Sequence, residues 1–366
     1  MTYTAKTLYS YFGRHFFIGL GIVLALLALL MLTVEVIEHL RRASGREIPF
    51  SVILSLSVIK MPTTMQKLWP FVFLFGGMLS FSRLANSSEL VVARAAGMSV
   101  WQILTPLIGI AALSGLFITT IYAPVAASLM SRYNLENQAY FGGKVSLISR
   151  ASAGGLWMRE STPEGHVVIY AQRVGESGTF MEGVTFLIHG QENRFTTRID
   201  AEIAILDDGQ WAMRNVVLTR PDKLPETHKN FALNTTLSLD RIVNSLTPPE
   251  SISFWKLPDF IELMENSGFT SLKHKMYWHS LLAQPLLLSA MSLLAAMFCI
   301  RMTHRRTGTG WMFLAAAGAG FFIFFVTDLV GAFGSAGKIP VVLAAWTPAG
   351  VTSMMAAATM FHLEDG

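Results

Sequence analysis

Long apolar stretches, arranged in two groups, constrain this chain more than any other feature. A helix needs about 20 apolar residues to cross the hydrocarbon core of a bilayer. Three stretches lie before residue 132, three lie after residue 275, and a long polar segment separates the groups. They predict membrane spans at Phe16–Val34, within Ile48–Ser82, within Val100–Ala123, and at Met276–Ile300, Thr307–Thr327 and Ile339–Leu363.

The second predicted span is less regular than the others. Its apolar sequence is interrupted by Lys60 and Lys67, with Pro62 and Pro70 nearby. Its well-defined part is residues 68–82, and the sequence does not fix where it begins. The whole chain is 52% hydrophobic and only 14% charged, against about one-quarter charged in soluble domains.

The distribution of Lys and Arg predicts the orientation, because cytoplasmic loops are enriched in these residues. The cluster Arg301–Arg306 favours a cytoplasmic N-terminus most strongly, whereas Arg41–Arg46 opposes it. Six spans then place both termini in the cytoplasm and residues 132–275 outside. The first apolar run has no small-residue cleavage site after it, so we interpret it as a retained span.

The segment of residues 132–275 has the two-residue period of β-strands. Ile199, Ala201, Ile203 and Ile205 form one predicted apolar face, and Asp207–Gln210 is a hairpin turn signal. Residues 257–267 predict a short amphipathic helix. The predicted fold is therefore a bundle of six transmembrane helices (residues 1–131 and 276–366) with an all-β, jelly-roll-like domain (residues 132–275) inserted between helices three and four.

Several kinds of chemistry are excluded by missing motifs. Gly142-Gly143-Lys144 lacks the upstream glycine of a phosphate-binding loop, and Val145 replaces its Ser or Thr. No Cys/His pair has metal-ligand spacing, and the net charge of +4 brings no basic stripe for nucleic acid. We predict no catalytic residue, no bound metal or cofactor, no nucleic-acid partner and an inert, buried Cys299.

A short helix is predicted in the cytoplasmic link between spans two and three. Ser87 or Ser88 is suited to cap its start, Glu89 favours its positive first turn, and Gly97 ends it. One interpretation is a plain interfacial helix. The other is a docking helix for a cytoplasmic partner.

Five charges lie in or near the predicted spans, where charge is costly. Glu35 and Glu38, one turn apart at the outer end of span one, are expected to be exposed at the interface. Lys60 and Lys67 either reach outward to water or meet an anionic ligand in a cavity. Asp328 is expected to be exposed at the end of span five.

Three pieces of sequence carry a family resemblance. Residues 88–92 (Ser-Glu-Leu-Val-Val) precede 95–97 (Ala-Ala-Gly), Ala123-Pro124 is followed by Tyr140–Gly143, and Tyr277–Ser280 precedes Gln284–Leu286. Together with the order of spans and β domain, they resemble the lipopolysaccharide export permeases of the LptF/LptG family over almost the whole chain. The Ser-Glu-Leu-Val-Val text favours a G-type subunit.

The resemblance implies a transport role in the bacterial inner membrane, with the β domain in the periplasm. Such subunits pair with an LptF-type permease and are driven by a separate LptB ATPase dimer, which uses ATP and Mg. They extract lipopolysaccharide from the membrane lipid and pass it through the β-jellyroll towards LptC and the LptA bridge.

The resemblance also suggests roles for particular residues. The coupling helix would be Glu89, Leu90, Val91, Arg94 and Gly97. The lateral gate region would include Leu27 and Leu30 in span one, and Ala317 and Phe321 in the small-residue part of span five. Substrate-contacting candidates are Lys60, Lys67 and Arg132, with Glu35 where some relatives carry a basic residue, and Phe186 and Ile203 would line the lipid path.

Two other interpretations fit the sequence. One is a membrane-anchored scaffold or sensor whose β domain binds a partner and transports nothing. The other is an ATP-driven permease for another lipid or for a lipoprotein. The sequence does not fix the exact lipopolysaccharide chemistry, the gate conformation or the face of the β domain that carries lipid.

Overall fold

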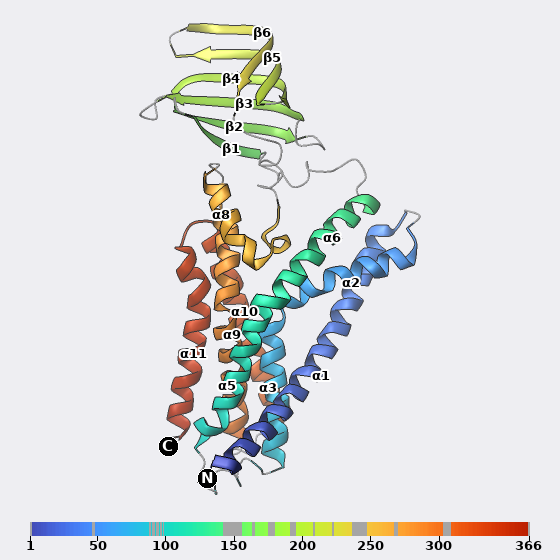
Figure 1. Ribbon diagram of the computed structural model, residues 1–366, viewed down its shortest axis with the longest axis vertical. Coiled ribbons are helices and arrows are strands. Elements are labelled where there is room, and N and C mark those ends of the chain that lie inside the picture. The colour runs from blue at the N-terminus through green and yellow to red at the C-terminus, as the bar shows by residue number, and fades with distance from the viewer. Residues whose placement is uncertain are drawn as a thin grey trace. The chain divides into compact units, whose positions relative to one another are not determined.

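The computed structural model divides the chain into two compact units (Figure 1). One unit holds residues 1–133, 250–255 and 272–366, and the other holds residues 134–249 and 256–271. The structure describes residues 2–45, 48–87, 89, 92, 95, 97, 99–141, 156–162, 165–174, 180–190, 195–207, 209–221, 223–235, 247–266, 270–302 and 309–364.

The first unit is helical. Helix α6 begins in this unit and continues past Tyr133 into the other. The helices are α1 (Thr2–Ala43), α2 (Phe50–Gln66), α3 (Trp69–Asn86), α5 (Val100–Phe117), the π-helix η1 (Ile118–Tyr122), α6 (Ala123–Phe141), α9 (Leu272–Met302), α10 (Thr309–Ser335) and α11 (Val341–Glu364).

The helix lengths and apolarity confirm the expected membrane part. Within the described residues, five helices are long and apolar enough to cross a bilayer. Helices α2 and α3, which meet at a 73° bend, make a sixth span if the two together are counted as one crossing. The bend falls between Gln66 and Trp69, where the predicted second span was irregular. Helix α10 extends to Ser335, so the exposed Asp328 lies inside the helix and the predicted end at Thr327 is wrong.

Glycines allow the helices at the centre of this unit to touch. A Cβ on Gly19 of α1 would lie 2.5 Å from the carbonyl oxygen of Gly76 in α3. A Cβ on Gly77 would lie 2.9 Å from Ala295 of α9. Small residues permit such approaches between membrane helices, where packing must replace a hydrophobic driving force. Helix α3 therefore packs closely against both α1 and α9, and the buried Phe73 of α3 lies against the buried Phe16 of α1.

Helices α5 and α9 meet at Pro285. Proline has no N–H, so the Leu281 carbonyl four residues earlier loses its helical donor. The Thr119 hydroxyl of η1 donates to that carbonyl at 2.8 Å. A Cβ on Gly115 would lie 2.4 Å from the Pro285 Cα. A π-helix is uncommon, and this one directs Thr119 towards α9 while the Tyr122 hydroxyl donates to the Pro62 carbonyl of α2 at 2.9 Å.

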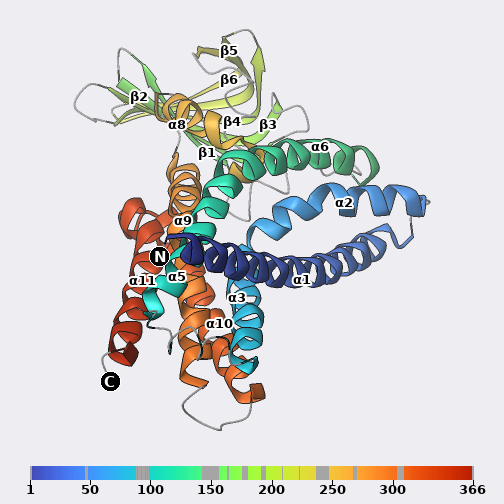
Figure 2. The same ribbon diagram turned by 60° about the horizontal axis from the view of Figure 1, so that its bottom comes forward.

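The second unit contains the predicted β domain. The six strands among its described residues form one antiparallel sheet in the order β1-β2-β3-β4-β5-β6, so each pairs with its neighbours in sequence (Figure 2). The strands are β1 (Leu156–Thr162), β2 (Gly165–Val174), β3 (Phe180–Gly190), β4 (Phe195–Asp207), β5 (Gln210–Arg220) and β6 (Lys223–Asn234). The fold class, a helical membrane part with an all-β domain, is confirmed.

The predicted hairpin between β4 and β5 is also confirmed. Asp207 pairs with Gln210, which leaves a two-residue loop. Gly209 in this loop has φ of +78°, a conformation that glycine adopts without steric cost. Turn chemistry that matches the right-handed twist of the strands explains why this signal was readable from sequence.

The buried face changes register along three strands. The next buried residue after Met181 in β3 is Val184, after Ala201 in β4 it is Ala204, and after Met213 in β5 it is Val216. These steps of three residues replace the usual step of two. The predicted face of β4 is therefore wrong beyond Ala201, since Ala204 and Leu206 are buried there.

The residues at the switch explain it. Gly183 lies opposite Glu202, and Glu202 lies opposite Asn215, in the gaps of the pairing between β3, β4 and β5. Gly183 and Asn215 have φ of +61° and +50°. The Asn215 side-chain amide donates to the Glu202 carboxylate at 2.6 Å. A row of irregular positions across the sheet therefore shifts which side chains face the core.

Helix α8 (Leu257–Asn266) follows the β-strands in this unit. Its buried residues are Leu257, Ile261 and Met264, at helical spacing. The predicted amphipathic helix is therefore confirmed.

Candidate functional site

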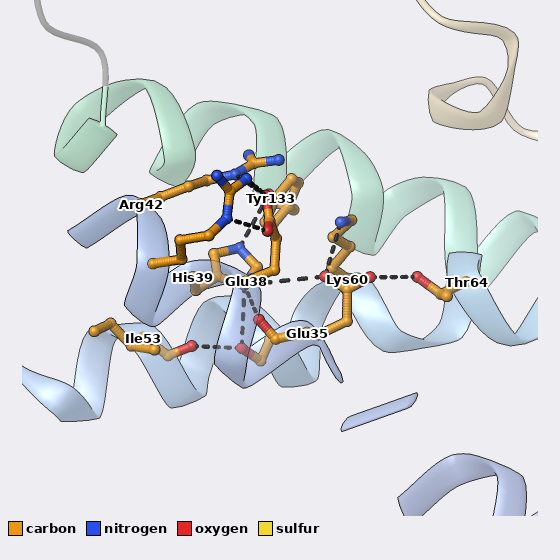
Figure 3. A network of polar contacts seen from close by, with 10 residues as sticks. Glu35, Glu38, His39, Arg42, Ile53, Lys60, Thr64 and Tyr133 are labelled. Atoms are coloured by element: carbon orange, nitrogen blue, oxygen red, sulfur yellow. Dashed lines mark hydrogen bonds and ion pairs between the residues drawn. The ribbon is translucent and has the colours of Figure 1, made fainter. Parts of the chain in front are cut away.

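A network of polar side chains joins the C-terminal part of α1 to α2 and α6. Figure 3 shows Glu35 of α1 facing Lys60 and Thr64 of α2, with Glu38 and His39 of α1 beside it. Tyr133 of α6 completes it, and all these residues belong to the helical unit. We call this network the polar junction. Charged side chains that pair within membrane helices are candidates for a functional site.

Glu35 and Lys60 form an ion pair at the centre of the polar junction. The Lys60 Nζ lies 2.8 Å from one Glu35 carboxylate oxygen, and the Thr64 hydroxyl donates to the other at 3.0 Å. The side chains of Glu35 and Lys60 are 9% and 24% exposed. The expectation that Glu35 is exposed at the interface is therefore wrong, because α2 packs over it and supplies a cation.

His39 lies one turn beyond Glu35 and is fully buried. Its Nδ1 is 2.7 Å from the Glu35 backbone carbonyl, which only accepts, so Nδ1 carries a hydrogen. Its Nε2 is 3.1 Å from the Tyr133 hydroxyl, which ties α1 to α6. Neither His39 nor Tyr133 was predicted from the sequence. The four-residue spacing of Glu35 and His39, which stacks them on one helix face, was the available signal.

The outer edge of the polar junction is charged and exposed. Glu38 accepts hydrogen bonds from Arg41 at 2.9 Å and from Arg42 at 2.8 Å, all on α1. The Arg41 and Arg42 side chains are 74% and 45% exposed. Pairs of this kind contribute little to stability, since water screens them. They keep Glu38 satisfied without involving α2.

The Glu35–Lys60 pair behaves differently from these surface pairs. Removing both charges from water is costly, and the attraction between them offsets that cost only when the geometry is good. Loss of one partner leaves a buried, uncompensated charge, which costs about 3–5 kcal/mol. The stability of the contact between α1 and α2 therefore depends on both charges being present.

The other basic candidates do not join the ion pair. Lys67 follows the last residue of α2 and is exposed. Arg132 precedes Tyr133 on α6 and is also exposed. Lys60 additionally lies 5.7 Å from the centre of the Tyr133 ring, a cation–π distance. Of the three basic residues expected to meet substrate, Lys60 is the one bound within the polar junction.

Part of the predicted coupling helix is described. Glu89, Val92 and Ala95 are helical, and Gly97 has the positive φ, +86°, of a helix end. Leu90, Val91 and Arg94 lie outside the described residues, as does Ser88. The Ser87 hydroxyl donates to the Arg83 carbonyl at the end of α3. The predicted cap at Ser87 or Ser88 involves residues outside the described ones and stays a prediction.

Glu89 contacts the first helix. The Tyr11 hydroxyl of α1 donates to the Glu89 carboxylate at 3.2 Å. The Tyr11 ring also packs against His15, with ring centres 4.5 Å apart. Helix α1 therefore carries the polar junction near one end and a contact with the predicted coupling helix near the other.

The predicted gate residues lie partly on exposed apolar surfaces. Leu30 of α1 and Phe321 of α10 are 51% and 61% exposed, whereas Leu27 packs against the core. Ala317 is partly buried. A Cβ on the neighbouring Gly320 would lie 2.4 Å from a Leu74 methyl group, so α10 approaches α3 closely here. The small-residue run thus serves a tight helix contact.

The two β-domain residues differ from each other. Phe186 is fully buried and packs edge-to-face on Trp211. Ile203 pairs with Glu182 and Arg214 and is partly exposed, because the register switch puts Ala204 in the core instead. The expectation that Ile203 points inward is therefore wrong. Of the two, Phe186 is the residue on the buried face of the sheet.

No metal-binding cluster appears among the described residues, in a search for three or more His, Cys, Asp or Glu. Cys299 is buried, as predicted, and its thiol lies 3.6 Å from the Met78 carbonyl. Some of the described polar groups of the membrane helices join one helix to another, as Thr119 does with Leu281 and His39 with Tyr133. These features define a multi-pass membrane protein with an inserted β domain, the class that contains permease subunits.

The comparison with known proteins specifies the family. The chain matches the model of the lipopolysaccharide export system permease LptF/LptG over residues 10–362 and belongs to this family. It is 24% identical to the Escherichia coli K12 lipopolysaccharide export system permease protein LptG over 301 residues, 79% of each chain. It is 21% identical to the Haemophilus influenzae LptG over 358 residues, 94% of this chain and 95% of that one. It is thus a multi-pass inner-membrane permease component.

Proposed function

We propose that this chain is the transmembrane subunit of an ATP-driven transporter that extracts lipopolysaccharide from the inner membrane. The observation that carries the proposal is the extent of the family match. It runs from residue 10 to residue 362 and so includes both groups of membrane helices and the β domain. A match of this extent favours a whole permease subunit over a scaffold that shares one domain.

The energy in this proposal comes from another protein. A separate LptB ATPase dimer, using ATP and Mg, docks on the coupling helix at Glu89. Leu90, Val91, Arg94 and Gly97 complete that helix. Support comes from the described helical residues at 89, 92 and 95 and from the contact between Tyr11 and Glu89. Movement of the coupling helix then reaches α1 directly.

The proposed cargo path has three parts. Lipopolysaccharide enters between this chain and an LptF-type partner, at a gate formed by α1 and α10. It leaves through the β domain, on the periplasmic side, towards LptC and the LptA bridge. Both termini are cytoplasmic in this proposal. We assign the chain as the G-type subunit, which the names of the two relatives support.

The first test is copurification. We expect the purified chain to bring an ATPase dimer with it and the Glu89→Lys variant to lose most of it, because the substitution reverses the charge of the docking helix. Asp259→Lys, which makes the same kind of change on the exposed face of α8, is the matched control. Normal ATPase binding and normal lipid export by inserted Glu89→Lys protein would falsify the assigned role.

The second test follows the cargo. A photo-crosslinking amino acid is placed at the buried position 186, and position 203, which is partly exposed, is the control. Crosslinking is done in membranes with and without ATP. Adducts with lipopolysaccharide that form at Phe186 and depend on ATP support the proposal. Adducts with protein alone, unchanged by ATP, favour a non-transporting scaffold, and ATP-dependent adducts with a different lipid favour another permease.

A further inference from the structure

Glu89, in the predicted coupling helix, is held by a residue of another helix. The Tyr11 hydroxyl of α1 donates to one Glu89 carboxylate oxygen at 3.2 Å, although 78 residues separate the two in the chain. Among the described contacts, this is the one hydrogen bond that Glu89 makes. Tyr11 is 43% exposed and Glu89 is half-buried, so a second molecule can reach the pair.

The Tyr11 side chain is supported by its own helix. Its ring meets Phe12 and His15 edge-on, with ring centres 6.0 Å and 4.5 Å away. Phe12 is 1% exposed and belongs to the buried core of the helical unit, so packing fixes this end of α1. A glutamate side chain on a surface helix has several rotatable bonds and samples several rotamers. The hydrogen bond from Tyr11 selects one orientation among them.

We propose that Tyr11 is a positioning residue: its hydroxyl holds the Glu89 carboxylate in the orientation in which a partner ATPase binds it. The inference rests on the proposed function, in which the ATPase dimer docks on the coupling helix at Glu89. A carboxylate has about four acceptor sites, so the bond from Tyr11 leaves others for the partner. Fixing the side chain in advance also reduces the conformational entropy that is lost when the partner binds.

The test measures how tightly the full-length chain, together with its partner permease in detergent, binds the purified LptB ATPase. The key variant is Tyr11→Phe, which removes the hydroxyl and keeps the ring. Tyr9→Phe is the matched control, because Tyr9 lies on the same helix, is 37% exposed and makes no hydrogen bond among the described contacts. Glu89→Asp supplies a second background, since its shorter side chain keeps the charge but withdraws the carboxylate from Tyr11.

We expect Tyr11→Phe to bind the ATPase about fivefold more weakly than the wild type, the scale of one exposed hydrogen bond. Tyr9→Phe should match the wild type. In the Glu89→Asp background, Tyr11→Phe should cause no further loss, because Tyr11 acts only through the carboxylate. The unfolding temperatures of Tyr11→Phe and the wild type should agree closely, since water replaces the hydroxyl when an exposed hydrogen bond is lost.

Equal affinities of the wild type and Tyr11→Phe for the ATPase would overturn the inference. Tighter binding by Tyr11→Phe would also overturn it, since the hydroxyl would then withhold Glu89 from the partner. A loss that persists in the Glu89→Asp background, or that comes with a lowered unfolding temperature, would show that Tyr11 acts through the fold and not through Glu89. If the wild type binds no ATPase, the proposed function itself fails, so the two failures can be told apart.

Discussion

The helical unit contains two junctions that hold its helices together by opposite means. At the polar junction, α1 meets α2 and α6 through an ion pair and hydrogen bonds. At the junction of α5 with α9, Gly115 lies against the Pro285 backbone and Thr119 supplies the one hydroxyl that the proline makes necessary. The first depends on charge, and the second depends on shape.

The difference shows which contact is suited to change. Close packing has almost no adjustable component, because a displaced backbone loses many contacts at once. A pair of charges has an alternative partner in any incoming ion. We therefore expect the contact of α5 with α9 to stay fixed during function and the contact of α1 with α2 to be the adjustable one.

The largest effect should follow from filling the space at Gly115. Gly115→Leu places atoms where a Cβ alone would lie 2.4 Å from the Pro285 Cα, so we expect loss of the folded protein or destabilisation of about 3 kcal/mol or more. Thermal unfolding in detergent measures the effect. Gly109→Leu in the same helix is the control, since nothing lies within 4 Å of a Cβ there. Equal stability of the two variants would contradict the close contact.

The next effect should come from removing the buried cation. Lys60→Met leaves Glu35 buried and unpaired, so we expect destabilisation of about 3–5 kcal/mol, measured by the same unfolding experiment. Lys67→Met, at the exposed end of α2, should have almost no effect. The double variant Glu35→Leu/Lys60→Met should recover most of the loss, because it removes both charges. A double variant as unstable as Lys60→Met would mean that the ion pair is not the cause.

A smaller effect is expected at Thr119. Thr119→Val keeps the shape of the side chain but removes the donor to the Leu281 carbonyl, which Pro285 leaves without a helical partner. An unsatisfied buried carbonyl costs about 1–3 kcal/mol in stability. Thr120→Val is the matched control, because the Thr120 hydroxyl bonds only within its own segment in the described contacts. Similar unfolding temperatures for both variants would show that the carbonyl finds another donor.

The smallest effect should come from Tyr133. Tyr133→Phe removes the hydroxyl bonded to His39 Nε2 and keeps the ring near Lys60, so we expect a loss of about 1 kcal/mol. The readout is again the unfolding temperature, with the exposed Tyr140→Phe as the reference. A loss as large as that of Lys60→Met would place the stability of the polar junction in its hydrogen bonds rather than in its charges.

The sequence was informative where local patterns decide the structure. The apolar stretches predicted the spans, and the turn at Gly209 predicted the β4–β5 hairpin, since both depend on neighbouring residues. The register switch was not predictable in the same way. It requires Gly183, Glu202 and Asn215 to meet across three strands, and period two in any one strand does not reveal that meeting.

The candidate site was predictable only in its parts. Lys60 and Glu35 were both noted as charges in apolar segments, but 25 residues separate them in the chain and only folding brings them together. Taken alone, Glu35 favoured exposure at the interface, and Lys60 left open either exposure or an anionic ligand in a cavity. The π-helix that presents Thr119 is equally hidden, because no composition signal distinguishes one residue of extra winding.

The length of α1 has a mechanical consequence. The helix is continuous over 42 residues, and Tyr11, which contacts Glu89, is separated from Glu35 by about 36 Å at 1.5 Å per residue. With an arm of that length, pivoting α1 about its Tyr11 end by about 5° shifts Glu35 by about 3 Å. A shift of that size away from α2 would separate Glu35 from the Lys60 Nζ, which lies 2.8 Å from its carboxylate. A small tilt of α1 at its Tyr11 end would therefore be enough to break the Glu35–Lys60 contact near its other end.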